Sequence, residues 1–245
     1  MEMSTAEGPF VISESEPRSK DELPTRPHRE PLTRQRIVRA ALRIMDEEGL
    51  EAVTMRRIGR ALGVEAMSLY NHVRDKEEIL DSICEEVLSE FEIPEARDWR
   101  GAMRAGAKEY RRLLLTHPRV ITLMTGRKGP VTNIDSLKAY EFALGMFRDA
   151  GLSVLESIKA LNALASYILG SVTLELGLTI SGRADEAHLR AHEEMGRLVA
   201  SADFPHVRES LPHMIACDVD EQFDFGLELL IEAVAARVKH TADEP

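Results

Sequence analysis

The residues Val53–Leu80, VTMRRIGRALGVEAMSLYNHVRDKEEIL, carry the pattern of two short helices joined by a tight turn. Gly59 would lie on the inner face of the first helix, where a side chain larger than a methyl group would hold the helices apart. Gly63 falls in the turn, and Leu69 falls where the second helix, expected over about Ala66–His72, must bury an aliphatic side chain. These offsets are typical of a helix-turn-helix motif.

Capping residues predict where the neighbouring helices begin. Thr33, Thr54 and Asp75 are residue types that accept a hydrogen bond from the first free N–H groups of a helix. Glu78 lies three residues after Asp75, which completes a capping box. Gly49, which tolerates a positive φ, is expected to end the first helix. The chain is therefore expected to open with a small three-helix unit followed by a fourth helix.

Helical periodicity continues after Pro94, and the alternation typical of strands is hard to find. Short connections are expected around His117-Pro118, Gly126–Pro130 and Phe204–Pro212. The predicted fold class is all-α, with the N-terminal helix-turn-helix unit followed by a larger helical bundle. The expected longer helices are Trp99–Thr116, Asn133–Ala150, Ser153–Leu176, Ala184–Ala200 and Val219–Lys239.

Composition divides the chain into three parts. Residues 1–31 hold five of the eleven prolines and few large apolar residues, so they are expected to form a disordered N-terminal tail. The basic end of this tail, Arg26-Pro-His-Arg29, is either a solvated linker or an arm that contacts the minor groove of DNA. The helix-turn-helix domain is placed at residues 32–78, and the larger helical domain at residues 79–240.

Charge is distributed unevenly along the chain. The whole sequence has 42 acidic and 31 basic residues, a net charge of −11, which excludes a protein that coats nucleic acid with its entire surface. Between Leu32 and Lys76, however, nine basic residues outnumber six acidic ones, a net charge of +3. A basic module on an acidic body can orient itself on a polyanion. The alternative is a solvated helical face that is basic by chance.

Two cysteines, Cys84 and Cys217, lie far apart in the sequence, which excludes a disulfide scaffold and a cysteine-rich zinc module and favours a reducing cytoplasm. Ala160–Ile180 is apolar and long enough to span a membrane, but it includes Asn162 and Glu175, which would be costly in lipid. No membrane partner is therefore expected. A helix that is apolar on most sides is instead expected to lie within a bundle or a subunit interface.

No catalytic, cofactor or metal site is predicted. His188 and His192 are spaced four residues apart on an expected helix, but Leu189 and Ala191 occupy the positions where zinc-protease motifs need a glutamate. Phosphate-binding loops and the Gly-x-Ser-x-Gly motif are absent from the sequence, and Gly126–Pro130 follows no strand. The chain is therefore not expected to be an enzyme.

The expected recognition helix, Ala66–His72, carries side chains that suit contact with DNA. Ser68, Asn71 and His72 can hydrogen-bond to base edges or phosphates, and Tyr70 can reach a phosphate through its hydroxyl group. The two apolar residues at its start could contact a thymine methyl group, and the starts of the flanking helices favour phosphates. The residues expected at the DNA are Thr54, Arg56, Ala66, Met67, Ser68, Tyr70, Asn71, His72 and Lys76.

The same stretch closely resembles the N-terminal DNA-binding region of the TetR family of bacterial repressors. The resemblance spans Leu32–Val87 and is most specific at Leu69–Lys76, which reads Leu-Tyr-x-His-Val-x-x-Lys. Ala66, Met67 and Asn71 differ in type from the base-reading residues of the tetracycline-repressor branch, which implies a different operator. The resemblance assigns phosphate or base contact to Thr54, Arg56, Ser68, Tyr70, His72 and Lys76.

A weaker resemblance to the tetracycline-repressor branch continues through the C-terminal part. Phe223–Leu230 resembles the last helix of that branch, and Leu144–Gly177 resembles its middle helices. In that branch two helices of each subunit form a four-helix interface, which here implies a homodimer through about residues 153–177 and 219–239. The C-terminal bundle is therefore expected to bind an effector and to dimerise.

The resemblance fails at the effector pocket. Glu92, Gly106 and Leu123 would align with drug- and magnesium-binding residues but suit neither role, so tetracycline with magnesium is disfavoured. The wider family instead implies a small, apolar effector in the C-terminal bundle. Each candidate lining residue could also be plain core, because methionines and aromatic residues pack cores routinely. The candidates are Trp99, Met103, Tyr110, Met124, Phe142, Met146 and Tyr167.

These features together predict a cytoplasmic, homodimeric, ligand-responsive transcriptional regulator, a repressor that a small apolar effector releases from a palindromic operator of double-stranded DNA. The alternative is an α-helical enzyme or small-molecule-binding protein whose helix-turn-helix is purely structural. Sequence-specific binding to double-stranded DNA would separate the two.

Overall fold

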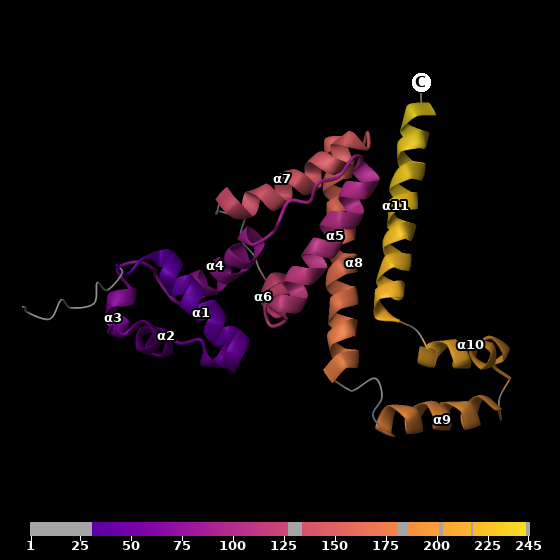
Figure 1. Cartoon of the computed structure of the whole chain (residues 1–245), viewed down its shortest axis with the longest axis horizontal. Helices are drawn as coiled ribbons and strands as arrows, with labels where there is room; N and C mark the ends of the chain where they lie inside the picture. The colour runs from indigo at the N-terminus through magenta and orange to yellow at the C-terminus, as the bar shows by residue number, and fades with distance from the viewer. Residues whose placement is uncertain (1–30, 127–133, 181–185, 201–202, 217, 244–245) are drawn as a thin grey trace, which may run out of the picture. The chain divides into compact units, whose positions relative to one another are not determined.

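Helices form all of the regular secondary structure in the described part of the chain, which confirms the predicted all-α fold class (Figure 1). The computed structural model describes residues 31–126, 134–180, 186–200, 203–216 and 218–243. The predicted tail lies outside these ranges except for its last residue, as does most of the connection expected at Gly126–Pro130. In chain order the helices are α1 (Arg34–Glu48), the short 3₁₀ helix η1 (Leu50–Ala52), α2 (Met55–Leu62), α3 (Ala66–Leu69), α4 (Lys76–Ser89), α5 (Trp99–Thr116), α6 (Val120–Gly126), α7 (Ile134–Asp149), α8 (Val154–Ile180), α9 (Glu186–Ala200), α10 (Pro205–Ala216) and α11 (Val219–Asp243).

Side-chain caps start α1, α2 and α4 at the predicted residues. Thr33, Thr54 and Asp75 each accept a hydrogen bond from the backbone N–H three residues further on, at 3.2, 3.1 and 2.8 Å. Gly49 and Gly63 adopt positive φ angles of 99° and 68° at the ends of α1 and α2. These boundaries are predictable because caps and terminal glycines act on backbone groups only a few residues away.

The helix-turn-helix motif depends on a close backbone approach at Gly59. A Cβ atom at this residue would lie 2.9 Å from the carbonyl oxygen of Val64 and 3.2 Å from the backbone nitrogen of Ala66. Even a methyl group is therefore too large here, which is a stricter limit than the sequence indicated. Ile58 and Leu69, both fully buried, supply the apolar contacts of α2 and α3.

The second helix of the motif is shorter than predicted. α3 ends at Leu69 rather than at His72, and the following turn has a hydrogen bond of 2.9 Å from the His72 N–H to the Leu69 carbonyl. The chain must change direction at this point because the next residue, Val73, is buried and Asp75 already caps α4. The last three residues of the predicted recognition helix are therefore presented by a turn.

Two helices occur in or next to predicted connections. α6 begins two residues after His117-Pro118, and α10 covers most of Phe204–Pro212. Pro205 occupies the first position of α10, where a proline is tolerated because the first N–H groups of a helix have no partner within the helix, and Pro212 lies inside the helix. The expected connection over Phe204–Pro212 is therefore wrong, because neither proline interrupts the helix.

α4 packs against α1 on one side and against α6 and α7 on the other. Ile79, Ile83 and Val87 are fully buried along it. The Arg39 guanidinium of α1 donates to the Glu86 carboxylate of α4 at 2.5 Å, and this ion pair adds a polar link between the two helices. Thr33–Pro245 form one compact unit, and α4 runs through the domain boundary predicted between residues 78 and 79, so that boundary stays a prediction.

The larger bundle is built on α5, α7, α8 and α11, which contact one another around a second apolar core. Each of these helices contributes at least one side chain with 2% or less of its surface exposed. Because one core draws on residues more than a hundred positions apart, its composition follows from tertiary packing. Representative members are Met103, Leu114, Phe147, Ile168 and Leu227.

A series of ion pairs connects α5 to α11. The basic residues of α5 recur every three or four positions, and the acidic residues of α11 recur every four positions in the reverse order, so the two helices run antiparallel in one register. Most of these side chains are exposed, but Arg111 is only 14% exposed and also pairs with Glu175 of α8. Each exposed pair is expected to contribute at most about 1 kcal/mol, so the main effect of the series is to favour this register. The pairs are Arg100–Glu232, Arg104–Glu228, Lys108–Asp224 and Arg111–Asp220.

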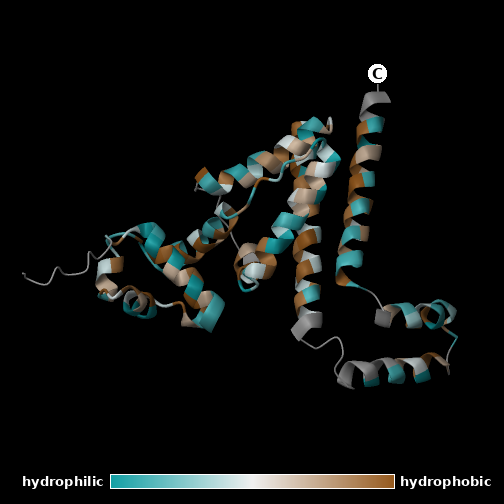
Figure 2. Ribbon diagram, viewed as in Figure 1, coloured by the Kyte–Doolittle hydropathy of each residue, from teal (hydrophilic) through white to brown (hydrophobic). Residues whose placement is uncertain are grey.

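α8 is strongly apolar, yet the described chain covers only one side of it. Leu164, Ile168 and Val172 are buried, whereas Leu155 and Leu174 are mostly exposed. By length and composition alone, Val154–Gly177 could cross a membrane, and only 17% of its most apolar window is buried. Figure 2 shows apolar residues along the length of α8 and a mixed pattern on α11. Within the described residues of one chain, this helix is therefore only partly buried.

Replacement of Gly59 by alanine should destabilise the protein by about 1–3 kcal/mol, because the new methyl group collides with backbone atoms that cannot move independently. The measurement is urea unfolding at a fixed protein concentration. The matched control is Gly145→Ala in α7, where a Cβ meets nothing within 4 Å and helix propensity predicts a gain of about 0.5–1 kcal/mol. A Gly59→Ala protein as stable as the parent would contradict the close approach.

Candidate DNA interface and ligand pocket

The helix-turn-helix motif presents one side of α3 and of the following turn to solvent. Leu69 and Val73 are buried, with 0% and 3% of their surface exposed, and they anchor the segment to the core. Met67 and Tyr70 are 75% and 47% exposed. The segment predicted to read DNA therefore has one anchored face and one free face.

None of the nine residues predicted to contact DNA is buried in the structure. They lie at the start of α2, on α3 and its following turn, and at the first position of α4, and contacts of α1 with α2 and α4 and of α2 with α3 hold these segments in one unit. Six are exposed and three are half-buried. The exposed residues are Thr54, Arg56, Met67, Tyr70, Asn71 and His72, and the half-buried ones are Ala66, Ser68 and Lys76.

The basic residues of this unit fall into two groups. Arg57 pairs with Glu48, and Arg74 pairs with Glu78, so the charges of these arginines are already compensated. Within the described ranges, the side chains of Arg56, Arg60 and Lys76 form no ion pair. A cation without a carboxylate partner remains available to a phosphate, and the exposed Arg43 of α1 is a fourth basic residue of this unit without an ion pair in the described ranges.

Glu78 fastens the start of α4. Its carboxylate accepts hydrogen bonds from the backbone N–H of Arg74 at 2.8 Å and from the Arg34 side chain of α1 at 3.3 Å. The backbone N–H of Arg74 holds the pKa of Glu78 below its ordinary value, and the guanidinium groups of Arg74 and Arg34 lower it further. Arg34 also donates to Ser82 at 2.6 Å. These bonds fix the position of Lys76, two residues earlier, relative to α1.

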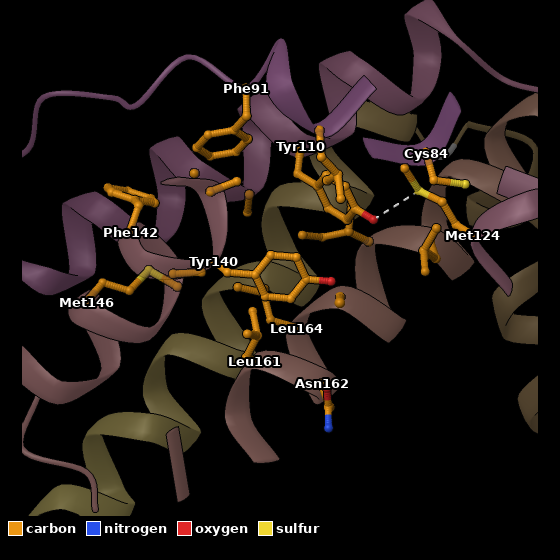
Figure 3. A pocket seen from close by; sticks show the side chains of 18 residues that line it. Cys84, Phe91, Tyr110, Met124, Tyr140, Phe142, Met146, Leu161, Asn162 and Leu164 are labelled. Carbon is orange, nitrogen blue, oxygen red and sulfur yellow. Dashed lines mark hydrogen bonds between the residues drawn. The ribbon is translucent and has the colours of Figure 1, made fainter. Parts of the chain in front are cut away.

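A cavity of about 240 Å³ lies in the larger bundle (Figure 3). Its wall is formed by residues just before and after the end of α4 and by side chains of α5, α6, α7 and α8. Apolar and aromatic groups dominate this wall, which is usual for a small-molecule site. The lining residues that the figure labels are Cys84, Phe91, Tyr110, Met124, Tyr140, Phe142, Met146, Leu161, Asn162 and Leu164.

Four of the seven predicted lining residues belong to this cavity, namely Tyr110, Met124, Phe142 and Met146. The other three do not line this cavity, and their predicted contact with an effector stays a prediction. Trp99 contacts the Arg100 guanidinium, which lies 4.9 Å from its ring centre. Met103 is buried beside a separate hollow between α8 and α11, and the Tyr167 hydroxyl donates to the Phe223 carbonyl of α11 at 2.7 Å. A helical period alone does not tell which side of α5 or α8 faces a cavity.

The sequence reasoning missed the contribution of α4 and Tyr140 to the cavity. Cys84, Leu88 and Phe91 project into it from α4 and the residues after it, and Tyr140 reaches it from α7. Phe91 continues the spacing of the apolar residues Ile79, Ile83 and Val87, which indicates a buried side chain. The first three residues are fully buried, whereas Phe91 lines the cavity. Periodicity does not show which part of the protein each of these side chains contacts.

Gly106 explains why this pocket departs from the tetracycline-binding pattern. A Cβ atom at Gly106 would lie 2.7 Å from the Phe142 ring, so the aromatic ring occupies the space that a longer side chain would need. Glu92 is exposed, and its backbone N–H donates to the Glu109 carboxylate at 3.1 Å. Leu123 is half-buried and absent from the cavity wall.

A polar junction connects α1 to the segment between α5 and α6. The His117 ring lies 2.8 Å from the Asp46 carboxylate through Nδ1 and 3.2 Å from the Glu90 carboxylate through Nε2. Arg119 donates to the carbonyl oxygens of Met45, at 2.8 Å, and of Asp46. The end of α1, the end of α4 and the start of α6 therefore meet at His117.

Metal ligands do not cluster in the part of the chain that the structure describes, where no group of three or more His, Cys, Asp or Glu side chains could hold an ion. The side chains of His188 and His192 lie outside the described residues. The carboxylates of Glu48, Glu78, Glu86 and Glu109 are engaged in ion pairs within the protein.

Comparisons with known proteins agree with both parts of the chain. Residues 37–83 match the family "Bacterial regulatory proteins, tetR family", and residues 93–238 match "Tetracyclin repressor-like, C-terminal domain". An HTH-type transcriptional regulator from Saccharopolyspora erythraea is 31% identical over 215 residues, which cover 84% of this chain and 85% of that protein. The HTH-type transcriptional repressor DrrR1 from Streptomyces coeruleorubidus is 30% identical over 229 residues, covering 90% and 84%.

A solved structure shows the same fold. The Streptomyces coelicolor TetR family protein ActR, in complex with actinorhodin, superposes with a TM-score of 0.73 at 26% identity and covers 85% of this chain and 99% of that one. The two family matches together span the helix-turn-helix and the bundle with its cavity. The chain belongs to the TetR family of bacterial regulatory proteins.

Proposed function

We propose that this TetR-family transcriptional regulator is a repressor that binds a palindromic operator as a homodimer and releases it when a small apolar effector enters the cavity. The orientation of the segment after the turn carries this proposal. Leu69 and Val73 hold the segment, while Met67, Tyr70 and Asn71 face solvent. An anchored segment with a free polar face is suited to a major groove.

The proposed contacts divide by chemistry. Ser68, Asn71 and His72 carry hydrogen-bonding groups that can read base edges, and the exposed Met67 can contact a thymine methyl group together with the neighbouring alanine. Phosphates would be held by the residues that start α2 and α4 and by the exposed tyrosine of the turn. The proposed phosphate-binding residues are Thr54, Arg56, Tyr70 and Lys76.

The exposed apolar faces of α8 and α11 support a homodimer through about residues 153–177 and 219–239. Leu174 of α8 and Phe225 of α11 are 67% and 68% exposed in the single chain. A Cβ at Gly170 or Gly177 would meet no atom within 4 Å, so a second helix could approach α8 closely. A two-fold dimer presents two reading segments, which requires a palindromic operator with half-sites about one helical turn apart or somewhat more.

Two helices can transmit the state of the cavity to the DNA-binding unit. α4 has Lys76 at its first position and Cys84 in the cavity wall. Met124 of α6 lies in the same wall. Just before the start of α6, the His117 ring contacts the Asp46 carboxylate and Arg119 donates to the Met45 carbonyl, both at the end of α1. A ligand that displaces either helix would change the spacing of the two reading segments, and a coupling of about 1–3 kcal/mol would lower operator affinity roughly 5–150-fold.

This proposed function requires no catalysis. The proposed location is the bacterial cytoplasm, where operator DNA is found and a buried thiol such as that of Cys84 stays reduced. A gel-shift experiment with the promoter region next to the gene tests the function. We expect a saturable complex that unrelated DNA does not compete away. Binding that ignores sequence, or none at all, would contradict the proposal and would favour a purely structural helix-turn-helix.

Lys76→Ala should weaken binding to all DNA sequences alike and lower the salt dependence by about one ion, because a phosphate contact is lost. Asn71→Ala should instead change which bases are preferred at one position of each half-site. Fluorescence anisotropy over a range of salt concentrations, with operator variants, measures both. Lys138→Ala, an exposed lysine of α7 paired with Asp135, is the control and should change neither. Identical losses for Lys76→Ala and Asn71→Ala would contradict the assigned contacts.

Leu174→Arg should weaken the dimer by at least about 3 kcal/mol, roughly a hundredfold, because an unpaired charge would be buried between two copies. Analytical ultracentrifugation measures the dissociation constant. Met67→Arg, an equally exposed apolar residue of α3, should leave the dimer intact although it alters DNA binding. If both variants remain dimeric to the same extent, the interface lies elsewhere.

His117→Ala should reduce the coupling between effector and operator by about 1 kcal/mol, since the end of α1 loses a link to the segment before α6. The measurement compares operator affinity with and without a compound found to release the operator in a screen. His213→Ala, on an exposed position of α10, is the control. Full release of the His117→Ala protein by the same compound concentration would show that this junction does not transmit the signal.

A further inference from the structure

Tyr110 is a half-buried hydrogen-bond donor without a strong acceptor among the described residues. Its hydroxyl group projects from α5 into the cavity, and the one partner recorded for it among the described residues is the thioether sulfur of Met124, at 3.4 Å (Figure 3). A thioether is a weak acceptor. Burial raises the pKa of Tyr110 above its ordinary value of 10.0, and Tyr140 and Cys84 raise it slightly further, so the hydroxyl stays protonated at neutral pH.

The rest of the described lining offers little polar chemistry. The Asn162 amide points away from the other labelled side chains, and Tyr140 has 42% of its surface exposed. None of the eighteen described lining residues is Asp, Glu, Lys, Arg or His. The described wall therefore provides the hydroxyl donor of Tyr110 and no charged group.

The apolar part of the wall is aromatic to an unusual degree for this chain. Phe91 and Phe142 lie with ring centres 5.8 Å apart and planes at 45°, and Tyr110 and Tyr140 add two further rings. The whole sequence has only seven Phe, four Tyr and one Trp, so a third of its aromatic residues line this one cavity. Rings in tilted arrangements favour a flat ligand that can pack edge-to-face or offset against them.

We propose that the ligand of this cavity is a small, uncharged aromatic molecule with a carbonyl oxygen, and that Tyr110 selects it by donating a hydrogen bond to that oxygen. The bond replaces a contact with a weak sulfur acceptor by a stronger O–H···O interaction. A carboxylate in the same place would have to leave water without meeting a cation, which is costly. The inference rests on the proposed function only in taking the cavity as the ligand site.

Three probes that share a naphthalene ring test the inference by calorimetric titration of the full-length protein at pH 7. Acetonaphthone has a carbonyl acceptor, ethylnaphthalene has the same shape without it, and naphthoate carries a negative charge. We expect acetonaphthone to bind about three- to tenfold more tightly than ethylnaphthalene. Naphthoate should bind at least about tenfold more weakly than acetonaphthone.

The variant Tyr110→Phe removes the hydroxyl and keeps the ring. It should abolish the preference for acetonaphthone over ethylnaphthalene, while ethylnaphthalene itself binds within about twofold of the parent value and so reports an intact cavity. Tyr167→Phe is the matched control, because this tyrosine lies outside the cavity wall and its hydroxyl donates to the Phe223 carbonyl, and it should retain the preference.

Tightest binding of naphthoate, a preference for acetonaphthone that survives in Tyr110→Phe, or failure of acetonaphthone to bind would each overturn the inference. A second readout separates this inference from the proposed function. If acetonaphthone binds with the expected Tyr110-dependent preference but leaves DNA binding unchanged, the ligand class stands, and control of the repressor through this cavity fails.

Discussion

The structure depends on the packing of α4 between two apolar cores. One side of this helix closes the three-helix unit through Ile79, Ile83 and Val87, which are fully buried. Cys84 and Leu88, together with Phe91 just after the helix, form part of the cavity wall. Because the side chains of α4 that face the three-helix unit are close-packed, a shift of the helix at the cavity wall also disturbs that packing.

Polar contacts also hold α4 in place against α1. Glu78 ties the start of α4 to Arg34 of α1, and Glu86 ties its later half to Arg39 of the same helix. His117 meets α1 and the end of α4 at a second point. These links join α1 and α4 at successive points, so a displacement at the cavity can reach the DNA-binding unit as movement of α4 or of the end of α1.

The long helix α8 poses a different physical problem. Its buried stripe completes the core of one chain, but its opposite side exposes leucines and open glycines to solvent. An exposed apolar face of this extent is unfavourable in a free monomer, and a second copy of the chain is the occupant proposed here. The same property makes the helix long and apolar enough for a membrane by composition alone. Composition cannot distinguish lipid from a partner helix, because both offer an apolar surface.

Local chemistry made the early part of the fold predictable. The caps at Thr33, Thr54 and Asp75, the positive φ of Gly49 and the turn at Gly63 involve only neighbouring residues, and the structure has them as predicted. α10 escaped prediction because its two prolines are tolerated in context. Of the predicted lining residues, Tyr110, Met124, Phe142 and Met146 lie in the cavity wall. Trp99, Met103 and Tyr167 do not, because a helical period does not identify the partner of each face.

The helix-turn-helix, the positive charge of this unit beside the acidic body, and the family of the chain could all be read from the amino-acid sequence. The helix-turn-helix depends on spacings of a few residues, and the charge depends on composition. The contact of Tyr110 with the Met124 sulfur, the position of Phe142 beside Gly106, and the contribution of α4 to two cores could not be read in this way. Each of these contacts joins residues on different helices, and its distance is fixed by how whole helices pack rather than by local preference.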